Sequence, residues 1–198
     1  GGFLSTMNAA QVDTLLGRAY RAWDGAQFAA CLDRFGIVRR KAIKDYSRGM
    51  KMKLSIAAAL SHGAELLILD EATSGLDPVV RDEVLDLLYD FMQDETHAVL
   101  LSSHITSDLD KIADNITFIH RGRVLLSEGR DELIDRHGVL RCTEEQLNAL
   151  DPDAVRAVRK GAFGCEALVK RDGIPENWPV EPVSVEQIML FLTRGEEA

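Results

Sequence analysis

The sequence lacks any apolar run long enough to cross a bilayer. Its apolar stretches, such as 66–69 and 98–101, have the length of a strand, whereas a membrane-spanning helix needs about 20 residues. The first five residues contain no basic segment followed by an apolar one, so no secretory signal is predicted there. We therefore expect any role at a membrane to depend on binding a membrane partner.

Positive charge is also scarce. The chain has 23 lysines and arginines against 32 aspartates and glutamates, which gives a net charge of −9. Proteins that bind nucleic acid use a surplus of lysine and arginine against the phosphate backbone. Nucleic acid is therefore not expected as a main partner.

The sequence contains few cysteines, and their spacing forms no recognisable motif. The three cysteines, Cys31, Cys142 and Cys165, are far apart in the sequence and form no C-x-x-C motif. Such residues fit reduced cytosolic thiols that pack as small apolar side chains. A zinc or redox role is not favoured by this pattern.

What the sequence does contain is typical of a folded protein. Its 198 residues are 46% hydrophobic and 28% charged, enough for one substantial core with a small appendage. Residues 1–62 read as mainly helical, because apolar residues recur at helical spacing over 11–35 and again over 48–62. Ser47 is a plausible N-cap of the second region, and Gly63 a plausible stop.

The middle of the chain changes character. The run 65–70 is short, apolar and ends in acid, as expected for a strand buried on both faces of a parallel sheet. Asp77 and Pro78 predict the start of a helix. A second buried strand is expected at 97–102 and a third strand at 115–120, with a helix between them. This strand–helix alternation implies one parallel, helix-covered sheet.

The tail after Gly129 is mixed. Segments 139–142, 144–150, 153–158 and 165–170 suggest a small β-α-β unit, and an amphipathic helix is expected over 184–192. We therefore divide the chain into a helical subdomain (1–62), half of an α/β core (63–129) and a C-terminal extension (130–198).

The pattern most informative about function is the apolar strand followed by Asp70 and Glu71. Two consecutive acids there lie at the carboxyl edge of a sheet, where α/β proteins bind ligands. One acid can hold Mg²⁺, and the other can polarise a water for attack on phosphorus. Taken alone, the same pattern also describes a strand end with two solvated acids.

The flanking residues extend this pattern. The run DEATSGLDP, 70–78, resembles the Walker B motif and D-loop of ABC ATPases. Upstream, Tyr46 to Met50 (YSRGM) resembles the family's signature, usually L-S-G-G-Q, and downstream His104 resembles the switch histidine. Three motifs in the family's order identify the chain as resembling an ABC transporter ATP-binding subunit of the bacterial drug and antibiotic exporter type. The resemblance covers roughly residues 3–130.

The resemblance implies a fold and a set of ligands. The fold expected is α/β: a partial P-loop NTPase parallel sheet with a helical subdomain and a small α+β C-terminal extension. The cofactors implied are ATP and Mg²⁺. The partners implied are a second ATPase subunit, in a dimer that sandwiches two ATPs, and transmembrane permease subunits. The expected location is cytoplasmic, peripheral on the inner face of the cell membrane.

The resemblance also implies residue roles. Asp70 would be the magnesium ligand, Glu71 the general base, and His104 a partner of the γ-phosphate and attacking water. Asp77 would couple the two sites of the dimer, although capping the next helix is an equally good reading and does not exclude this role.

In the signature, Ser47, Arg48 and Gly49 would contact the nucleotide of the opposite subunit, through backbone N–H groups at a helix start. Simple N-capping is the alternative for Ser47. The motif departs from the family pattern, with Arg48 in place of the first glycine and Met50 in place of glutamine. Arg48 adds positive charge or obstructs close approach.

No stretch fits the phosphate-binding P-loop, G-x-x-x-x-G-K-[ST]. We expect the P-loop, the first strands and the adenine-stacking aromatic to lie outside this chain. Phe3 to Thr6 resemble the strand into the Q-loop, and Gln11 is the nearest glutamine. A truncated sheet predicts exposed apolar surface and weak ATP binding by the chain alone.

Three functions remain open at this point. The first is the motor subunit of an exporter that couples ATP hydrolysis to transport. The second is a non-catalytic interaction module that keeps the ABC fold. A third, a soluble ABC ATPase of translation or DNA repair, is disfavoured by the acidic balance and the exporter-like tail.

Overall fold

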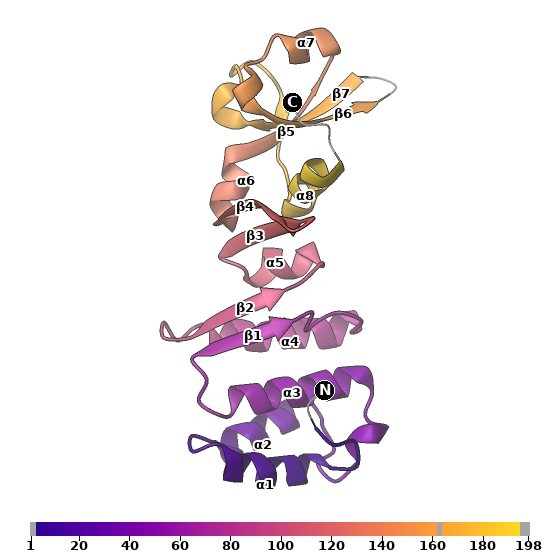
Figure 1. Ribbon diagram of the computed structural model, residues 1–198, viewed down its shortest axis with the longest axis vertical. Coiled ribbons are helices and arrows are strands. Elements are labelled where there is room, and N and C mark those ends of the chain that lie inside the picture. The colour runs from indigo at the N-terminus through magenta and orange to yellow at the C-terminus, as the bar shows by residue number, and fades with distance from the viewer. Residues whose placement is uncertain (1–2, 162–163, 195–198) are drawn as a thin grey trace. The chain divides into compact units, whose positions relative to one another are not determined.

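The computed structural model describes residues 3–161 and 164–194 (Figure 1). The chain divides into two compact units, with the boundary between Ile105 and Thr106. The division into three parts at 62 and 129 stays a prediction. Among the described residues, no helix is both long and apolar enough to cross a membrane.

The first unit begins with helices. The elements are α1 (Ala9–Ala19), α2 (Gly25–Arg34), the short 3-10 helix η1 (Ile43–Asp45) and α3 (Arg48–Leu60). Asn8 and Gln11 form a capping box at the start of α1, each side chain bonding the backbone N–H of the other. The Gln11 side chain is therefore used to cap the start of α1.

The central elements of this unit are β1 (Leu66–Asp70), α4 (Pro78–Phe91) and β2 (Ala98–Ser102). The two strands pair in parallel, and Asp70 lies opposite Ser102 at their carboxyl ends. As predicted, α4 begins after Asp77, whose side chain accepts a hydrogen bond from Val80 N. Lys53 of α3 pairs with Glu83 of α4 and lies over the Phe35 ring, which fastens the helices together.

The prediction that β1 and β2 are buried on both faces is wrong. Leu66, Ile68 and Leu100 are 54%, 71% and 61% exposed, whereas Leu67 is buried. The pair is a sheet of two strands only, and Figure 1 shows α4 running alongside it. One face is therefore covered and the other is open, which confirms the expected exposure of apolar surface.

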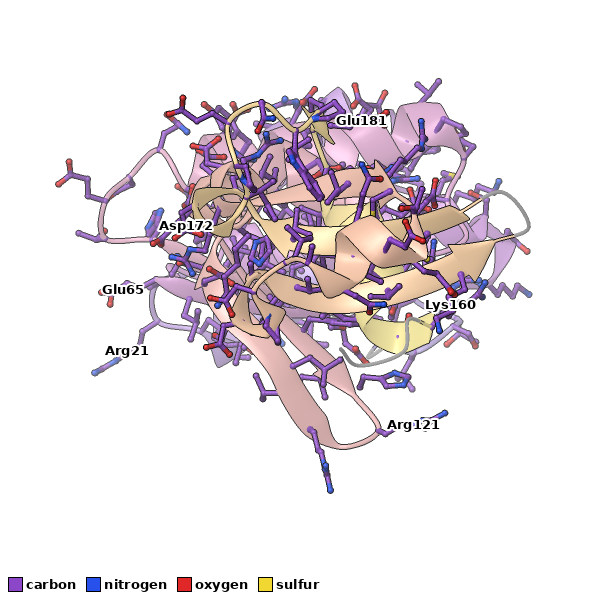
Figure 2. All side chains as sticks on the ribbon, turned by 90° about the horizontal axis from the view of Figure 1, so that it is seen from above. Arg21, Glu65, Arg121, Lys160, Asp172 and Glu181 are labelled. Atoms are coloured by element: carbon purple, nitrogen blue, oxygen red, sulfur yellow. The ribbon has the colours of Figure 1, made fainter. Side chains whose placement is uncertain are left out.

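The second unit begins with α5 (Thr106–Ile112), β3 (Asn115–His120), β4 (Arg123–Gly129) and α6 (Arg130–Arg136). We predicted β3 in the parallel sheet, but it pairs with β4 in an antiparallel hairpin. The two turn residues, Arg121 and Gly122, have φ of 49° and 76°, which suits a two-residue turn between twisted strands. Figure 2 shows Arg121 projecting from the tip.

The remaining elements build a four-stranded antiparallel sheet in the order β6-β7-β5-β8. Its strands and accompanying helices are β5 (His137–Cys142), α7 (Glu144–Asn148), η2 (Pro152–Ala154), β6 (Val155–Gly161), β7 (Gly164–Lys170), η3 (Arg171–Gly173), β8 (Val180–Glu181) and α8 (Val185–Arg194). The expected α+β extension is present, although α6 was not predicted.

This sheet is buried on both faces. Side chains alternate along each strand, so that Leu140 and Ala167 join one apolar cluster while Val139 and Leu168 join another. The second cluster also contains Ile188 and Phe191 of α8 together with Leu133 of α6. The two clusters form the core of the second unit.

Candidate functional site

Asp70 lies at the carboxyl end of β1 and is held by the neighbouring strand. The Ser102 hydroxyl donates a hydrogen bond of 2.5 Å to Oδ1 of Asp70. The same hydroxyl oxygen accepts from the backbone N–H of Glu71 at 3.1 Å. Because Ser102 is the register partner of Asp70, the parallel pairing itself sets this bridge. No hydrogen bond to the other carboxylate oxygen, Oδ2, is found among the described residues.

Glu71 has an unusual backbone. Its φ is 49°, in the left-handed region that a residue with a Cβ rarely adopts. Its N–H bonds both the hydroxyl and the carbonyl of Ser102, and its carbonyl accepts from Ser74 N. Backbone strain of this kind, of order 1–3 kcal/mol, is frequently found at functional sites.

His104 comes from the segment after β2 and meets Glu71. Its Nδ1 lies 2.6 Å from Oε2 of the Glu71 carboxylate, which can only accept, so Nδ1 is the donor. The two side chains are 68% and 40% exposed, which leaves both open to a ligand. A carboxylate oriented by an imidazole is an arrangement that can position a water and take its proton.

The signature residues lie at the start of α3. The Ser47 hydroxyl accepts from Met50 N at 3.2 Å, so the capping role considered from the sequence is present. A Cβ added at Gly49 would lie 3.4 Å from Cγ1 of Val80 and 3.7 Å from Cδ2 of Leu76. The signature therefore packs closely against the D-loop and the first turn of α4.

Arg48 extends over the D-loop. A Cβ on Gly75 would lie 2.7 Å from Nη1 of Arg48, so the guanidinium occupies the space that a side chain there would fill. Gly75 has φ of 69°, a conformation that favours glycine. This contact was not predicted from the sequence.

The sequence-predicted residues thus form two groups. Asp70, Glu71 and His104 lie at the ends of β1 and β2, and Ser47, Arg48 and Gly49 lie against the D-loop. Among the described residues, no hydrogen bond or ion pair joins one group to the other. Asp77, which ends the D-loop, caps α4 and belongs to neither group.

Sequence reasoning missed the contribution of Ser102. It noted the residue only as part of the segment leading to His104, whereas its hydroxyl connects Asp70 to the Glu71 backbone. The available signal was its place: a hydroxyl residue at the end of a strand that pairs in parallel with a strand ending in acid.

Comparison with known proteins gives a family similarity for part of the chain. Residues 4–74 match the sequence family described as ABC transporter. Residues 4–74 are therefore similar to part of an ABC transporter ATP-binding domain. The family is one of ATP-hydrolysing proteins, and the matched region contains the signature together with Asp70 and Glu71.

Three curated relatives illustrate the similarity. The bacitracin transport ATP-binding protein BcrA of Enterococcus faecalis is 40% identical over 99 residues, 50% of this chain and 32% of that protein. The lantibiotic transport ATP-binding protein SrtF of Streptococcus pyogenes is 38% identical over 96 residues, 48% and 42% of the two chains. The daunorubicin/doxorubicin resistance ATP-binding protein DrrA of Streptomyces peucetius is 36% identical over 135 residues, 67% and 40%. The chain thus spans about a third to two fifths of the length of these relatives.

Solved structures share the ABC ATPase fold. An ATP-binding cassette, solved as a dimer in a post-hydrolysis state with ADP and Pi, matches with a TM-score of 0.56 and 18% identity, over 65% of this chain and 59% of that one. An ABC transporter in an inward-facing conformation matches with the same TM-score and identity, over 86% and 68%. The expected P-loop NTPase fold class is thereby confirmed.

Proposed function

We propose that this chain supplies the hydrolytic carboxylates, the switch histidine and the signature of an ABC transporter ATPase that exports an antibiotic or drug. The observation that carries the proposal is the 2.6 Å contact between His104 and Glu71, next to an Asp70 carboxylate held by Ser102. The side chains of Asp70, Glu71 and His104, which follow the ends of two adjacent strands, converge at one sheet edge, where ligands of α/β proteins bind.

In this function Glu71 accepts the proton of the attacking water, and His104 orients the Glu71 carboxylate. The exposure of both side chains is consistent with a site that closes only when nucleotide and a second subunit are bound. Arg48 and the N–H groups at the start of α3 face the phosphates of the nucleotide held by the opposite subunit. Asp77 caps α4 and keeps the D-loop in place.

Mg²⁺ fits the donor set at Asp70. Magnesium is commonly held by one or two carboxylates, with substrate phosphates and water completing the octahedron. Oδ2 of Asp70 is open while Oδ1 is oriented by Ser102, and no cluster of three or more His, Cys, Asp or Glu side chains suited to a metal occurs among the described residues. One carboxylate plus phosphate oxygens is therefore the arrangement proposed, and the ion would neutralise charge on the phosphates.

The test is a matched pair of glutamine substitutions at the two ends of β1. Glu71→Gln keeps the shape of the side chain but removes the base, so ATP turnover should fall by about 10²–10⁴-fold while Mg-ATP binding is retained. Glu65→Gln, at the exposed other end of the strand (Figure 2), should leave turnover unchanged. The preparation must contain a P-loop as well as this chain, since the motif is absent from the 198 residues.

Two outcomes would count against the assignment. Undiminished turnover by Glu71→Gln would remove Glu71 from the base role. Loss of Mg-ATP binding in the same variant would mean that the carboxylate contributes to affinity rather than to the chemical step.

The partners in this function are a second ATPase subunit and transmembrane permease subunits. The place proposed for the protein is the cytoplasmic face of the membrane. The named relatives, two in antibiotic transport and one in drug resistance, support export of such a compound. Crosslinking of single cysteines introduced at Ser47 and Asp77 to a second ATPase subunit, dependent on nucleotide, would test the dimer.

A second function, that of a non-catalytic docking module, is supported by a different observation. The open apolar face of β1 and β2 and the absence of a P-loop motif favour a non-catalytic module that docks on a partner. In that case Glu71→Gln and wild type would support the partner's function equally. The convergence of Asp70, Glu71 and His104 favours the catalytic function, because docking alone requires none of them.

A further inference from the structure

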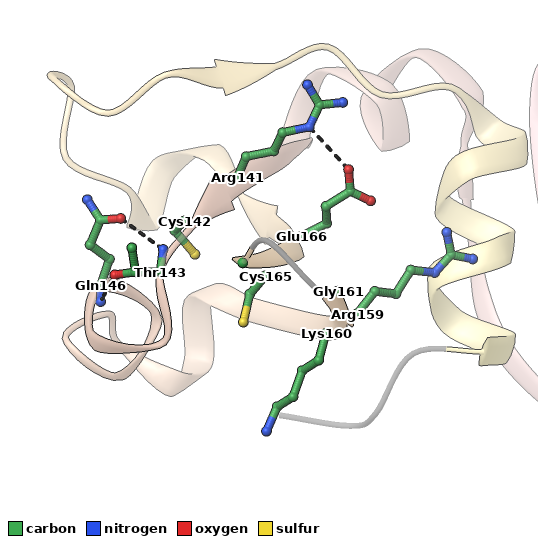
Figure 3. A pocket seen from close by; sticks show the side chains of 10 residues that line it. Arg141, Cys142, Thr143, Gln146, Arg159, Lys160, Gly161, Cys165 and Glu166 are labelled. Carbon is green, nitrogen blue, oxygen red and sulfur yellow. Dashed lines mark hydrogen bonds and ion pairs between the residues drawn. The ribbon is translucent and has the colours of Figure 1, made fainter.

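The second unit contains an open cavity of about 520 Å³ at the end of its four-stranded sheet (Figure 3). Two of the residues that line it are cysteines, Cys142 and Cys165. The remaining lining is mainly polar and includes Thr143, Gln146 and Lys160. A space of this size admits small polar molecules, since a water molecule in the liquid takes up about 30 Å³.

Cys142 and Cys165 are directly opposite each other in the antiparallel ladder of β5 and β7. Opposite residues in such a ladder have Cα atoms about 4.5 or 5.5 Å apart and side chains on the same face. Both separations fall in the range of disulfides, about 4.4–6.8 Å. The ladder therefore places the two thiols where a bond between them needs only small movements of the strands.

The local packing supports this approach. Both cysteines are buried in the same apolar cluster, at 8% and 3% exposed, and neither is in a disulfide. Burial raises the pKa of the Cys142 thiol, and the neighbouring Cys165 raises it further, so the thiols are within electrostatic reach. A Cβ on Gly164 would lie only 3.0 Å from the Cys142 carbonyl oxygen. Because glycine has no side chain, β7 can begin close to the end of β5.

Buried thiols without access are inert, and this was the expectation from the sequence. The cavity changes that expectation for two of the three cysteines. Cys31 is buried in α2 of the other unit, and no second cysteine lies in that unit. It therefore serves as an internal control for a thiol with burial but no partner.

We propose that Cys142 and Cys165 form a redox modification site that closes to an intramolecular disulfide when a hydroperoxide enters the cavity. One thiol, as its thiolate, attacks the peroxide, breaks the O–O bond and becomes a sulfenic acid; the other peroxide oxygen takes up the thiol's proton and leaves as water, or as an alcohol from an organic hydroperoxide. The second thiol then attacks that sulfur, the S–S bond forms, and the sulfenic oxygen leaves as a second water. Two thiols are oxidised and one peroxide is reduced.

The bond would fasten β5 to β7 and close a loop over residues 142–165, which includes α7 and β6. Closing a loop of this length stabilises the folded unit mainly by restricting the unfolded chain. This inference does not rest on the ATPase function, because both cysteines belong to the second unit.

The test uses the chain itself. Fully reduced protein is treated with a small excess of hydrogen peroxide, quenched, and its free thiols are alkylated after denaturation. We expect intact mass spectrometry to find the loss of two hydrogen atoms, with one alkylated cysteine, Cys31. Peptide mapping should find Cys142 joined to Cys165, and dithiothreitol should restore three free thiols.

The matched variants are Cys31→Ser, Cys142→Ser and Cys165→Ser. Cys31→Ser should keep the mass loss and gain a higher melting temperature on oxidation, whereas the other two should show neither. If either of those fails to fold, the peptide map of the wild-type chain still decides. Three alkylated cysteines after oxidation, a sulfinic acid at Cys142, or a link to Cys31 would overturn the proposal.

Discussion

The guanidinium of Arg48 lies against the backbone of Gly75, in the space where a side chain at position 75 would be. Arg48, which replaces the usual first glycine of the signature, is therefore accommodated by a glycine in the D-loop. This relationship joins two motifs that are 27 positions apart in the sequence. It also gives Gly75 two reasons to lack a Cβ: the contact and its φ of 69°.

Gly75→Ala separates these reasons. An alanine held at positive φ costs about 1–2 kcal/mol, whereas the clash involves the flexible end of Arg48 and can be relieved by its movement. We expect the substitution to lower the free energy of unfolding by that amount, measured by denaturant titration. The loss should be nearly the same in an Arg48→Ala background. A loss that disappears there would mean that the clash with Arg48, and not the positive φ, causes the destabilisation.

Ser47 allows its two roles to be told apart. Ser47→Ala removes the N-cap of α3 and should cost about 1 kcal/mol of stability. Ser47→Asp keeps an equally good cap but places negative charge where the proposed function brings a phosphate. We expect wild-type stability with reduced nucleotide-driven dimerisation for Ser47→Asp, measured by thermal unfolding and light scattering. Unreduced dimerisation would leave Ser47 with capping alone.

Ser102 is expected to act by positioning the carboxylates. Ser102→Ala removes the hydroxyl that donates to Asp70 and accepts from Glu71 N. Removal of such a supporting group typically costs about 10–100-fold in activity or metal affinity, so the Mg²⁺ concentration that supports half-maximal turnover should rise. Ser103→Ala is the matched control, since its hydroxyl accepts a hydrogen bond from Ile105 N within the same segment. Equal magnesium dependence for the two variants would contradict this role.

The sequence predicted local features well because their causes are local. The caps of α3 and α4, at Ser47 and Asp77, involve residues three positions apart, and their hydrogen bonds are present as expected. The placement of β3 failed for the opposite reason. Strand order along the chain does not determine partners, and the turn at Arg121 and Gly122 directs β3 back onto β4.

The candidate site was predictable in part for the same reason. Asp70 and Glu71 follow a strand, and the motif around them identified their setting. The left-handed backbone of Glu71 and the bridge through Ser102 depend on the register between two strands 31 positions apart. Periodicity along a single strand contains no information on that register. The hydroxyl residue at the end of β2 was the one available signal for the bridge, and the left-handed backbone of Glu71 had none.

The exposed face of β1 and β2 should bind hydrophobic dyes. Ile68 is 71% exposed and Leu100 61% exposed, on the face of the two strands opposite to the buried Leu67. Ile68→Thr keeps a β-branched residue suited to a strand but makes the surface polar. We expect lower dye fluorescence and less aggregation by light scattering, with helix content unchanged by circular dichroism. Dye binding equal to that of the wild-type chain would locate the apolar surface elsewhere.

The stability of the second unit should depend on pH through His137. Its ring is buried, and its Nδ1 donates to the Leu133 carbonyl. Burial is the main cause that lowers the pKa of His137 below its usual 6.5, against the opposing effect of that hydrogen bond. The unfolded chain therefore takes up the proton more readily than the folded one. Stability is fully present above about pH 6.5 and is lost as the pH falls through that value towards the lower folded pKa.

Thermal unfolding measured between pH 7.5 and 5.5 tests this dependence. The melting temperature of the wild-type chain should fall over the interval. His137→Asn keeps an N–H donor near the same place but cannot be protonated, so its melting temperature should fall less. Other groups titrate in both proteins alike, and the difference between the two curves isolates His137. Parallel curves would mean that His137 has the same proton affinity in the folded and unfolded states, despite its burial in the core.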